Sequence, residues 1–392
     1  MSGISNNVYN FTRYALGMHT KVLATLQEQT ATGSVINRMS DSPIEAYRLL
    51  GLESQSSEIT SQKAAIEEMI SVLEISSTVI EELASTFSDM QVNLTQVVSG
   101  TYSDSARQEL ANQIDDALEE VLAFANKTHL GNYIFGGSDT SSAPYVAEYS
   151  GDKITGVTYV GSSSERSVEV VAGVESSAYY VGTDLFASSD RGNTEFISDT
   201  GAEVGSGTSN IKGDGWITIT GTTGNWELSI DAGTTTVSSD GTQTNLAVTD
   251  ADGNVVYVDT TKITSAGSVY VRAEGTYDMF SSLISLRDIL LNEQNLSDGQ
   301  LEQVRSAASQ SLQEISELLT YDQIKLGAKM GFLTDISESL VNIEYNVDEQ
   351  DALLRDADVA QIAVDLARYE LLYEMSLSVS ANMLSTSLLD FL

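Results

Sequence analysis

A long heptad repeat of apolar residues constrains this chain more than any other feature of its sequence. Apolar side chains recur at 3.5-residue spacing over about 30 residues near the start and over about 40 residues near the end. Such spacing is typical of helices that pack as coiled coils. The sequence therefore predicts two long helices that share a seam, formed by Ile66, Met69, Leu73, Ile80, Leu83 and Phe87 and by Leu312, Leu319, Leu326, Leu333 and Leu340.

Three polar residues, Asp322, Lys329 and Gln350, occupy seam positions of the second helix. One interpretation is that the seam faces water there or that the helix turns slightly. The other is that polar seam positions fix the register between neighbouring helices, as they do in coiled coils.

Glycine divides the chain into three parts. Residues 131–275 hold 21 of the 29 glycines and both tryptophans, whereas the outer parts are poor in helix breakers. Short runs of β-forming residues at 157–160, 167–171, 216–220 and 226–230 are separated by turn residues. We expect an α+β multidomain protein, with a long α-helical coiled-coil or bundle stalk formed by both chain ends and a central all-β inserted domain. The predicted divisions are 1–42 with 356–392 (terminal helices), 43–145 with 276–355 (long-helix bundle) and 146–275 (β domain).

Both ends of the chain carry apolar residues at spacings of three and four. Chain ends usually fray in solvent, so apolar faces this close to both ends need partners. They could pair with each other within the chain or with other subunits. We predict subunit assembly through the residues Val8, Phe11, Met18, Val22, Ile362, Leu366, Tyr369, Tyr373, Leu384, Leu388 and Phe391.

Composition argues against several functions. The 392 residues carry a formal net charge of −37, which repels nucleic acid and anionic membranes. The chain has no cysteine and two histidines, and it shows no nucleophile, metal or acid–base constellation. It also lacks an apolar run long enough to span a membrane, and no classical signal peptide is visible. We therefore expect neither an enzyme nor a cofactor or metal, and no membrane insertion.

Four segments resemble a known family. The first holds Gly33, Ile36, Asn37 and Arg38, followed by Asp41 and Pro43, and the second runs from Gly131 through Tyr133, Phe135 and Gly136 to Gly137. The third is residues 356–360, and the fourth is the ending Leu-Leu-Asp-Phe-Leu. Together they resemble the flagellin superfamily and, more narrowly, the hook-associated protein 3 family of hook–filament junction proteins. Pro43 and the ending favour the junction family over flagellins, although Ser42 stands where that family typically has a second Asp.

The resemblance implies a structural part of the bacterial flagellum, at the junction between hook and filament. It implies export through the type III apparatus without a cleaved signal peptide, an extracellular location, and assembly by packing of the terminal helices. The implied partners are hook-associated protein 1, flagellin, further copies in a ring, and a cytoplasmic export chaperone on the C-terminal helix. Two alternatives stay open: flagellin itself, the bulk filament subunit, or a junction-type stalk with an adhesive β domain.

Overall fold

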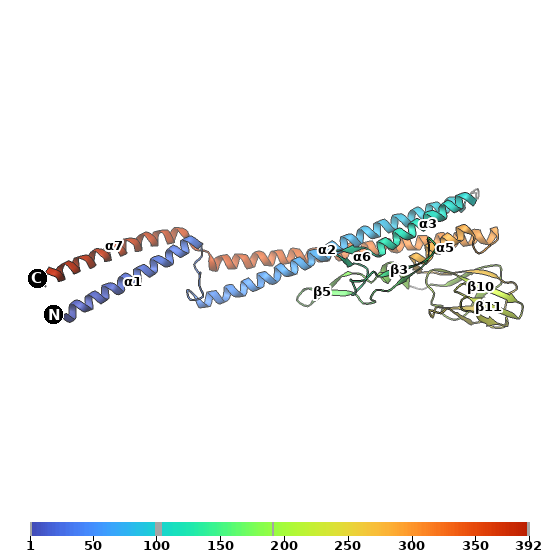
Figure 1. Ribbon diagram of the computed structural model, residues 1–392, viewed down its shortest axis with the longest axis horizontal. Helices are drawn as coiled ribbons and strands as arrows, with labels where there is room; N and C mark the ends of the chain where they lie inside the picture. Colours follow the sequence, from blue (N-terminus) through green and yellow to red (C-terminus); the bar gives the residue numbers. More distant parts are fainter. Residues whose placement is uncertain (1, 99–103, 190–191, 390–392) are drawn as a thin grey trace. The chain divides into compact units, whose positions relative to one another are not determined.

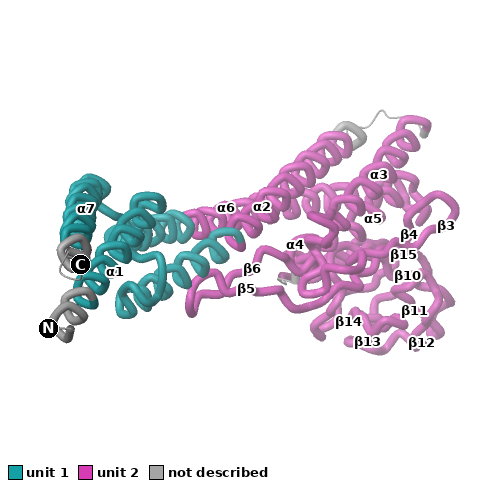
Figure 2. Tube along the Cα trace, turned by 60° about the vertical axis from the view of Figure 1, so that its left-hand side comes forward, with its two compact units in different colours: residues 1–64, 335–392 teal, residues 65–334 magenta. Residues whose placement is uncertain are grey.

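The computed structural model of the protein describes residues 2–98, 104–189 and 192–389. The chain forms two compact units, one from residues 1–64 with 335–392 and the other from residues 65–334 (Figure 2). Two long helices, α2 (Pro43–Val98) and α6 (Asp298–Arg355), contribute residues to both units. The division into three domains by residue number stays a prediction.

The first unit is helical. It contains α1 (Ser2–Thr32), the start of α2, the end of α6, and α7 (Val359–Leu389), and α1 and α7 lie side by side (Figure 1). Helix α2 begins at Pro43, where a missing N–H costs nothing because the first turn leaves that group unbonded. The Ala46 N–H donates to the Ser42 carbonyl oxygen (2.8 Å) and closes the first turn.

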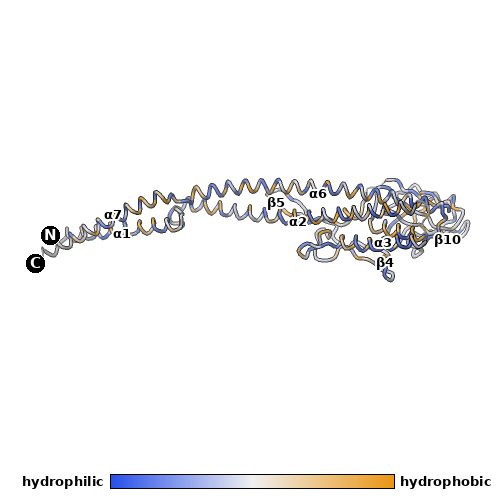
Figure 3. Tube along the Cα trace, turned by 90° about the horizontal axis from the view of Figure 1, so that it is seen from above, coloured by the Kyte–Doolittle hydropathy of each residue, from blue (hydrophilic) through white to orange (hydrophobic). Residues whose placement is uncertain are grey.

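The second unit combines the rest of α2 and α6 with α3 (Asp104–Ala125) and α5 (Met279–Leu291). Helices α3 and α5 pack against each other. Apolar residues recur along α2 and α6 between hydrophilic ones (Figure 3), which is the pattern that buries one stripe of a helix.

Short antiparallel hairpins follow α3. They are β1 (Thr128–His129) with β2 (Asn132–Tyr133), β3 (Tyr145–Ser150) with β4 (Lys153–Tyr159), and β5 (Arg166–Val171) with β6 (Val174–Tyr179). Strand β4 lies against α5 and α3. A pair formed by β7 (Ala187–Ser189) and β16 (Thr276–Asp278) leads into α5. The predicted all-β insert also contains a short helix, α4 (Gly182–Leu185), which the sequence pattern did not indicate.

Two larger sheets share one apolar core. The first has the strand order β12 (Val237–Ser239), β11 (Asn225–Ser229), β10 (Asp214–Thr222), β15 (Gly267–Ala273) and β8 (Thr194–Ile197). The second has the order β13 (Leu246–Thr249), β14 (Val255–Asp259) and β9 (Glu203–Val204). Alternate residues of both sheets point into the core, including Ile217, Leu228, Val248, Val256 and Val269. This arrangement follows from the period-two alternation of side chains along a strand.

Candidate assembly surfaces

The terminal helices α1 and α7 each have one covered and one open side. Ile362 is buried, and Val22, Leu366, Tyr369 and Tyr373 are half-buried. The rings of His19 and Tyr369 lie 6.1 Å apart, which places these side chains between the two helices. The structure therefore pairs α1 with α7.

Other apolar residues of the same helices face away from this contact. Phe11 is 73% exposed and Met18 is 52% exposed, and Leu371 and Met375 of α7 are exposed as well. Of the predicted assembly residues, the side chains of Val8, Leu384 and Leu388 and the whole of Phe391 lie outside the described residues. The pair of helices thus keeps an apolar surface that nothing in the described chain covers.

The two connectors of the first unit pair with each other as a short antiparallel bridge. Val35 donates its N–H to the carbonyl of Arg355 (2.8 Å), and Ala357 donates to the carbonyl of Gly33 (2.9 Å). Gly33 has φ +71°, the left-handed conformation that ends a helix and favours glycine. The Gly33 motif therefore sets the point where α1 ends and the connector starts.

The rest of this motif closes the connector on itself. The Asp41 carboxylate accepts from the backbone N–H groups of Asn37 (3.2 Å) and Arg38 (2.8 Å), and Asn37 donates to the carbonyl of Ser34 (3.1 Å). Arg38 forms an exposed ion pair with Glu28 (3.0 Å). Ile36 is half-buried. The polar motif residues therefore hold the backbone of the connector in shape. This structural role accounts for their residue types without a catalytic or ligand-binding role.

The predicted seam residues of the long helices are buried. Ile66, Leu73, Leu83 and Phe87 have no exposed surface, and Met69 and Ile80 are at most 5% exposed. The same holds for α6, where the exposure does not exceed 4% at Leu312, Leu319, Leu326, Leu333 and Leu340. Within the second unit, Gln323 of α6 donates to Glu81 of α2 (3.0 Å), and within the first unit Lys63 pairs with Glu344 (2.6 Å).

The polar seam positions of α6 have different surroundings. The Lys329 ammonium lies 5.0 Å from the ring centre of Tyr180, and burial lowers its pKa. Asp322 is also half-buried, and burial raises its pKa. Asp322 lines a small cavity together with Tyr180, which follows β6, and Asp184 of α4. In these two places α6 faces the inserted segment, whereas Gln350 is exposed.

The glycine-rich motif after α3 anchors the helix exit. The Phe135 ring meets Phe186 edge-on with centroids 5.3 Å apart, in a cluster that continues through Tyr145 and Phe280. A side chain at Gly136 would collide with the carbonyl oxygen of Asp139. Gly137 has φ +64°, and a Cβ there would lie 2.6 Å from the Ser162 carbonyl oxygen. Tyr133 is half-buried, and Gly131 has φ +84° in the turn between β1 and β2.

A buried polar network joins the first sheet to α6, and sequence reasoning missed it. Arg272 of β15 is 3% exposed and donates to Ser311 (3.1 Å), Gln310 (3.3 Å) and Glu314 of α6. Ser311 also donates to Asp214 of β10 (3.0 Å), and burial raises the pKa of Asp214 to about 6. The signal in the sequence was an arginine inside an apolar strand, because such a residue must find partners when it is buried.

A second buried arginine joins α5 to its neighbours. Arg287 is 5% exposed, pairs with Asp115 of α3 (2.8 Å) and donates to the carbonyl of Ile154 in β4 (2.7 Å). These contacts fix the β3–β4 hairpin on the helices of the second unit.

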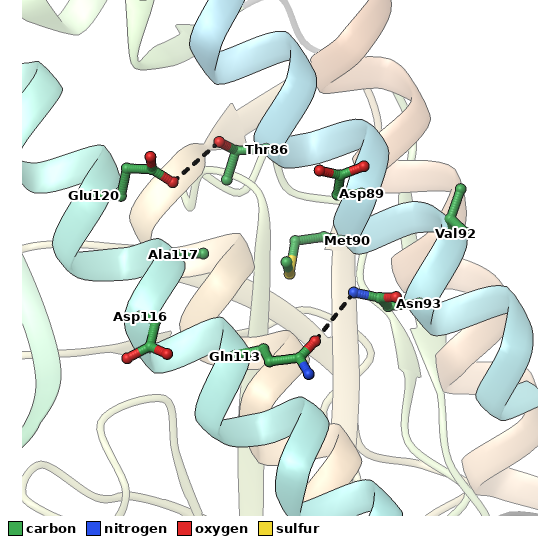
Figure 4. Close-up of a pocket in the computed structure, with 9 residues that line it drawn as sticks. All are labelled: Thr86, Asp89, Met90, Val92, Asn93, Gln113, Asp116, Ala117 and Glu120. Atoms are coloured by element: carbon green, nitrogen blue, oxygen red, sulfur yellow. Dashed lines mark hydrogen bonds between the residues drawn. The ribbon is translucent and has the colours of Figure 1, made fainter.

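A surface hollow of about 540 Å³ lies between α2 and α3 (Figure 4). Met90, which is 8% exposed, and Ala117 form its floor, and the carboxylates of Asp89, Asp116 and Glu120 lie around it. Thr86 donates to Glu120 (3.4 Å) and Asn93 to Gln113 (3.3 Å) across the two helices. The hollow therefore combines an apolar floor with an acidic rim.

The described residues show neither a candidate membrane span nor a cluster of metal ligands. None of the described helices is long and apolar enough to cross a membrane. Among the described side chains, no group of three or more His, Asp or Glu residues is placed to hold a metal ion.

Comparison with known proteins shows a similarity to flagellar proteins over part of the chain. Residues 4–140 match the bacterial flagellin N-terminal helical region. Flagellar hook-associated protein 3 of Escherichia coli (strain K12) is 27% identical over 177 residues, which make up 44% of this chain and 51% of that protein. The chain thus spans about half the length of this curated relative.

Solved structures share the fold. FlgL of Xanthomonas campestris superposes with a TM-score of 0.50 at 16% identity, over 75% of this chain and 98% of that one. The flagellar junction protein FlgL of Legionella pneumophila gives a TM-score of 0.50 at 14% identity, over 79% and 100%. The chain is therefore similar to the bacterial flagellin N-terminal helical region over residues 4–140, similar over less than half its length to flagellar hook-associated protein 3, and similar in fold to the two FlgL structures.

Proposed function

We propose that this protein forms the junction between hook and filament by packing its terminal helices against those of other subunits. The observation that carries the proposal is the open apolar side of α1 and α7, with Phe11 and Met18 on one helix and Leu371 and Met375 on the other. Each such side chain contributes about 1.5–3 kcal/mol once a partner covers it. Helices α1 and α7 bury only the apolar side chains that face each other. The apolar side chains left exposed favour assembly with other subunits over a free monomer.

The proposal also assigns each segment of the chain to a layer of the assembly. The terminal segments 1–42 and 356–392 would form the inner tube, segments 43–145 and 276–355 the next layer, and segment 146–275 the outer domain. The assembly residues are those predicted above. The family-motif residues act by shaping the connector and the helix exit, as the bonds of Asp41 and the packing of Phe135 support.

The proposed partners are hook-associated protein 1, flagellin and further copies of this chain in a ring. A cytoplasmic export chaperone would hold the C-terminal helix before type III export, and the assembled protein would lie outside the cell. The name of the Legionella pneumophila structure, a flagellar junction protein, supports this assignment. The proposed role is structural and involves no catalysis, nucleic acid or membrane insertion.

Flagellin itself is the second candidate. The match of residues 4–140 to the flagellin N-terminal helical region favours it. A flagellin would be the main protein of sheared filaments, whereas a junction protein would be a minor one.

Deletion of the gene, followed by electron microscopy of the cells and a blot of the medium, tests the proposal. Intact hooks without filaments, with flagellin shed into the medium, are the expected result. Loss of the bulk filament protein itself, with this chain as the main band of wild-type filaments, would instead show that it is flagellin.

Complementation with two single variants of α1 tests the open apolar side. Met18→Glu places a charge on that side, and Gln27→Glu places the same charge at an exposed polar position of the same helix. We expect the first to leave cells without filaments and the second to restore them. Equal complementation by both variants would contradict a role for this surface.

A further inference from the structure

Leu130 is unusual in two independent respects. Its side chain is 80% exposed, more than any other large apolar side chain that the structure describes. Its backbone has φ +49°, in the left-handed region that bulky L-residues rarely adopt. The other described non-glycine residues with positive φ are two asparagines and an alanine.

The strain arises from the turn between β1 and β2. His129 pairs with Asn132, so Leu130 and Gly131 form a two-residue turn, and both have positive φ. A type I′ turn requires this and strongly prefers Asn-Gly at these positions. Leucine is therefore a poor choice for the fold, and its side chain projects from the hairpin tip into solvent.

The hollow between α2 and α3 is complementary to this hairpin tip in polarity and charge. Its apolar floor of Met90 and Ala117 suits an aliphatic side chain, and its rim carries Asp89, Asp116 and Glu120 (Figure 4). Lys127, which is exposed, stands three residues before Leu130 at the base of the same hairpin. The hairpin thus offers an aliphatic tip and a cation, and the hollow offers an aliphatic floor and carboxylates.

We propose that the β1–β2 hairpin tip of one copy of this chain seats in the α2–α3 hollow of a second copy, with Leu130 on the floor and Lys127 at the acidic rim. Tip and hollow are different surfaces of one chain, so the contact is head-to-tail and can close into a ring. On a chain with a net charge of −37, a cation paired with a carboxylate rim also offsets repulsion between copies. The inference rests on the proposed ring assembly and assigns it a specific contact.

The variant Leu130→Asn removes the side chain that makes this contact without destabilising the fold. Asn-Gly suits the turn, so the melting temperature of the full chain should stay the same or rise. Self-association in sedimentation experiments should nevertheless weaken about tenfold to a hundredfold, as for a leucine lost from an interface. Ala232→Asn is the matched control, because Ala232 has φ +54° in another exposed turn and carries no large side chain. It should leave association unchanged, and association of Leu130→Asn equal to wild type would overturn the proposal.

A charge exchange tests the rim. Lys127→Glu and Asp116→Lys should each weaken self-association, and the double variant should recover most of the loss. Additive weakening in the double variant would show that the two residues do not meet.

The absence of cysteine permits a direct test in assembled flagella. We expect the double variant Leu130→Cys with Gln113→Cys to give a ladder of disulfide-linked oligomers under mild oxidation. Leu130→Cys alone, or combined with Thr223→Cys on the β10–β11 turn, should give dimers at most. No ladder from flagella that contain the protein would overturn the contact and leave the junction role standing. Absence of the protein from flagella, read on the same blot, would refute the junction role and this inference together.

Discussion

Replacement of Arg272 by methionine tests how the sheet β12-β11-β10-β15-β8 is fixed to α6. Arg272 is 3% exposed, and its guanidinium donates to Ser311 (3.1 Å), Gln310 (3.3 Å) and Glu314. Methionine fills a similar volume without the charge. The substitution therefore removes the cation from a network that also contains the buried carboxylate of Asp214.

The expected cost follows from the exposure of the groups left behind. Removal of one partner of a buried ion pair costs about 3–5 kcal/mol. Glu195 of β8 also pairs with the Arg272 guanidinium, at 3.6 Å. Glu314 is 35% exposed and Glu195 is 50% exposed, so water can solvate both after the change. Asp214 is 8% exposed and stays without a cation. We therefore expect a loss of about 3 kcal/mol in the free energy of unfolding, at the lower end of that range.

Urea unfolding followed by tryptophan fluorescence measures this loss selectively. Trp216 and Trp226 are the two tryptophans of the chain, and both lie in this sheet. The Trp216 ring stands 5.2 Å from that of Tyr270, next to the network. With a denaturant slope of about 1–3 kcal/mol per molar, the midpoint should fall by about 1–3 M.

Lys262→Met is the matched control. Lys262 pairs with Glu203 at 2.7 Å, but the two side chains are 64% and 52% exposed. Ion pairs in water contribute little because solvent screens them, so this midpoint should stay close to that of the wild type. Equal midpoints for the Arg272 and Lys262 variants would refute the idea that the buried network fixes the sheet.

Four further outcomes are expected. Burial raises the pKa of Asp214 from 3.8 to about 6, so the folded state binds its proton more tightly than the unfolded state does. Wild type should therefore gain about 2.4 kcal/mol of stability relative to Asp214→Asn as the pH falls from 8 to 4, and a pH-independent difference in urea unfolding would contradict this. Leu83→Ala removes a fully buried seam residue and should cost about 2.7–5 kcal/mol in thermal or urea unfolding, unless the helices close the cavity. Gly137→Ala should lower the melting temperature more than Gly131→Ala, because a Cβ at Gly137 meets the Ser162 carbonyl and one at Gly131 meets open space. Sedimentation should show stronger self-association as salt rises from about 10 to 150 mM, since screening weakens repulsion between acidic copies, and salt-independent association would exclude that repulsion.

The heptad repeat predicted the seam because burial along a helix follows a fixed period. Leu83 and Leu326 lie on the apolar stripe that this period defines, and both are buried. Local backbone preferences also set the start of α2 at Pro43 and the end of α1 next to Gly33. The flagellin-like motifs were likewise recognisable without a structure.

Contacts between distant residues were not readable from one sequence. Arg272 and Glu314 are 42 positions apart in the sequence, and Arg287 and Asp115 are 172 positions apart. No local sequence pattern therefore predicts these contacts. The polar seam residues show the same limit. Lys329 broke the heptad pattern, but only the structure shows that the ring of Tyr180 faces it.

By itself, the sequence determined the helical architecture, the β-rich insert and the resemblance to flagellar proteins, because these depend on period, turn chemistry and local motifs. The tertiary structure decided how the insert is held on α6 and α5 and which sides of α1 and α7 stay open. It also revealed the strained, exposed Leu130 at the β1–β2 turn. These features depend on which distant residues meet and on what water still reaches, and both are settled only when the chain packs.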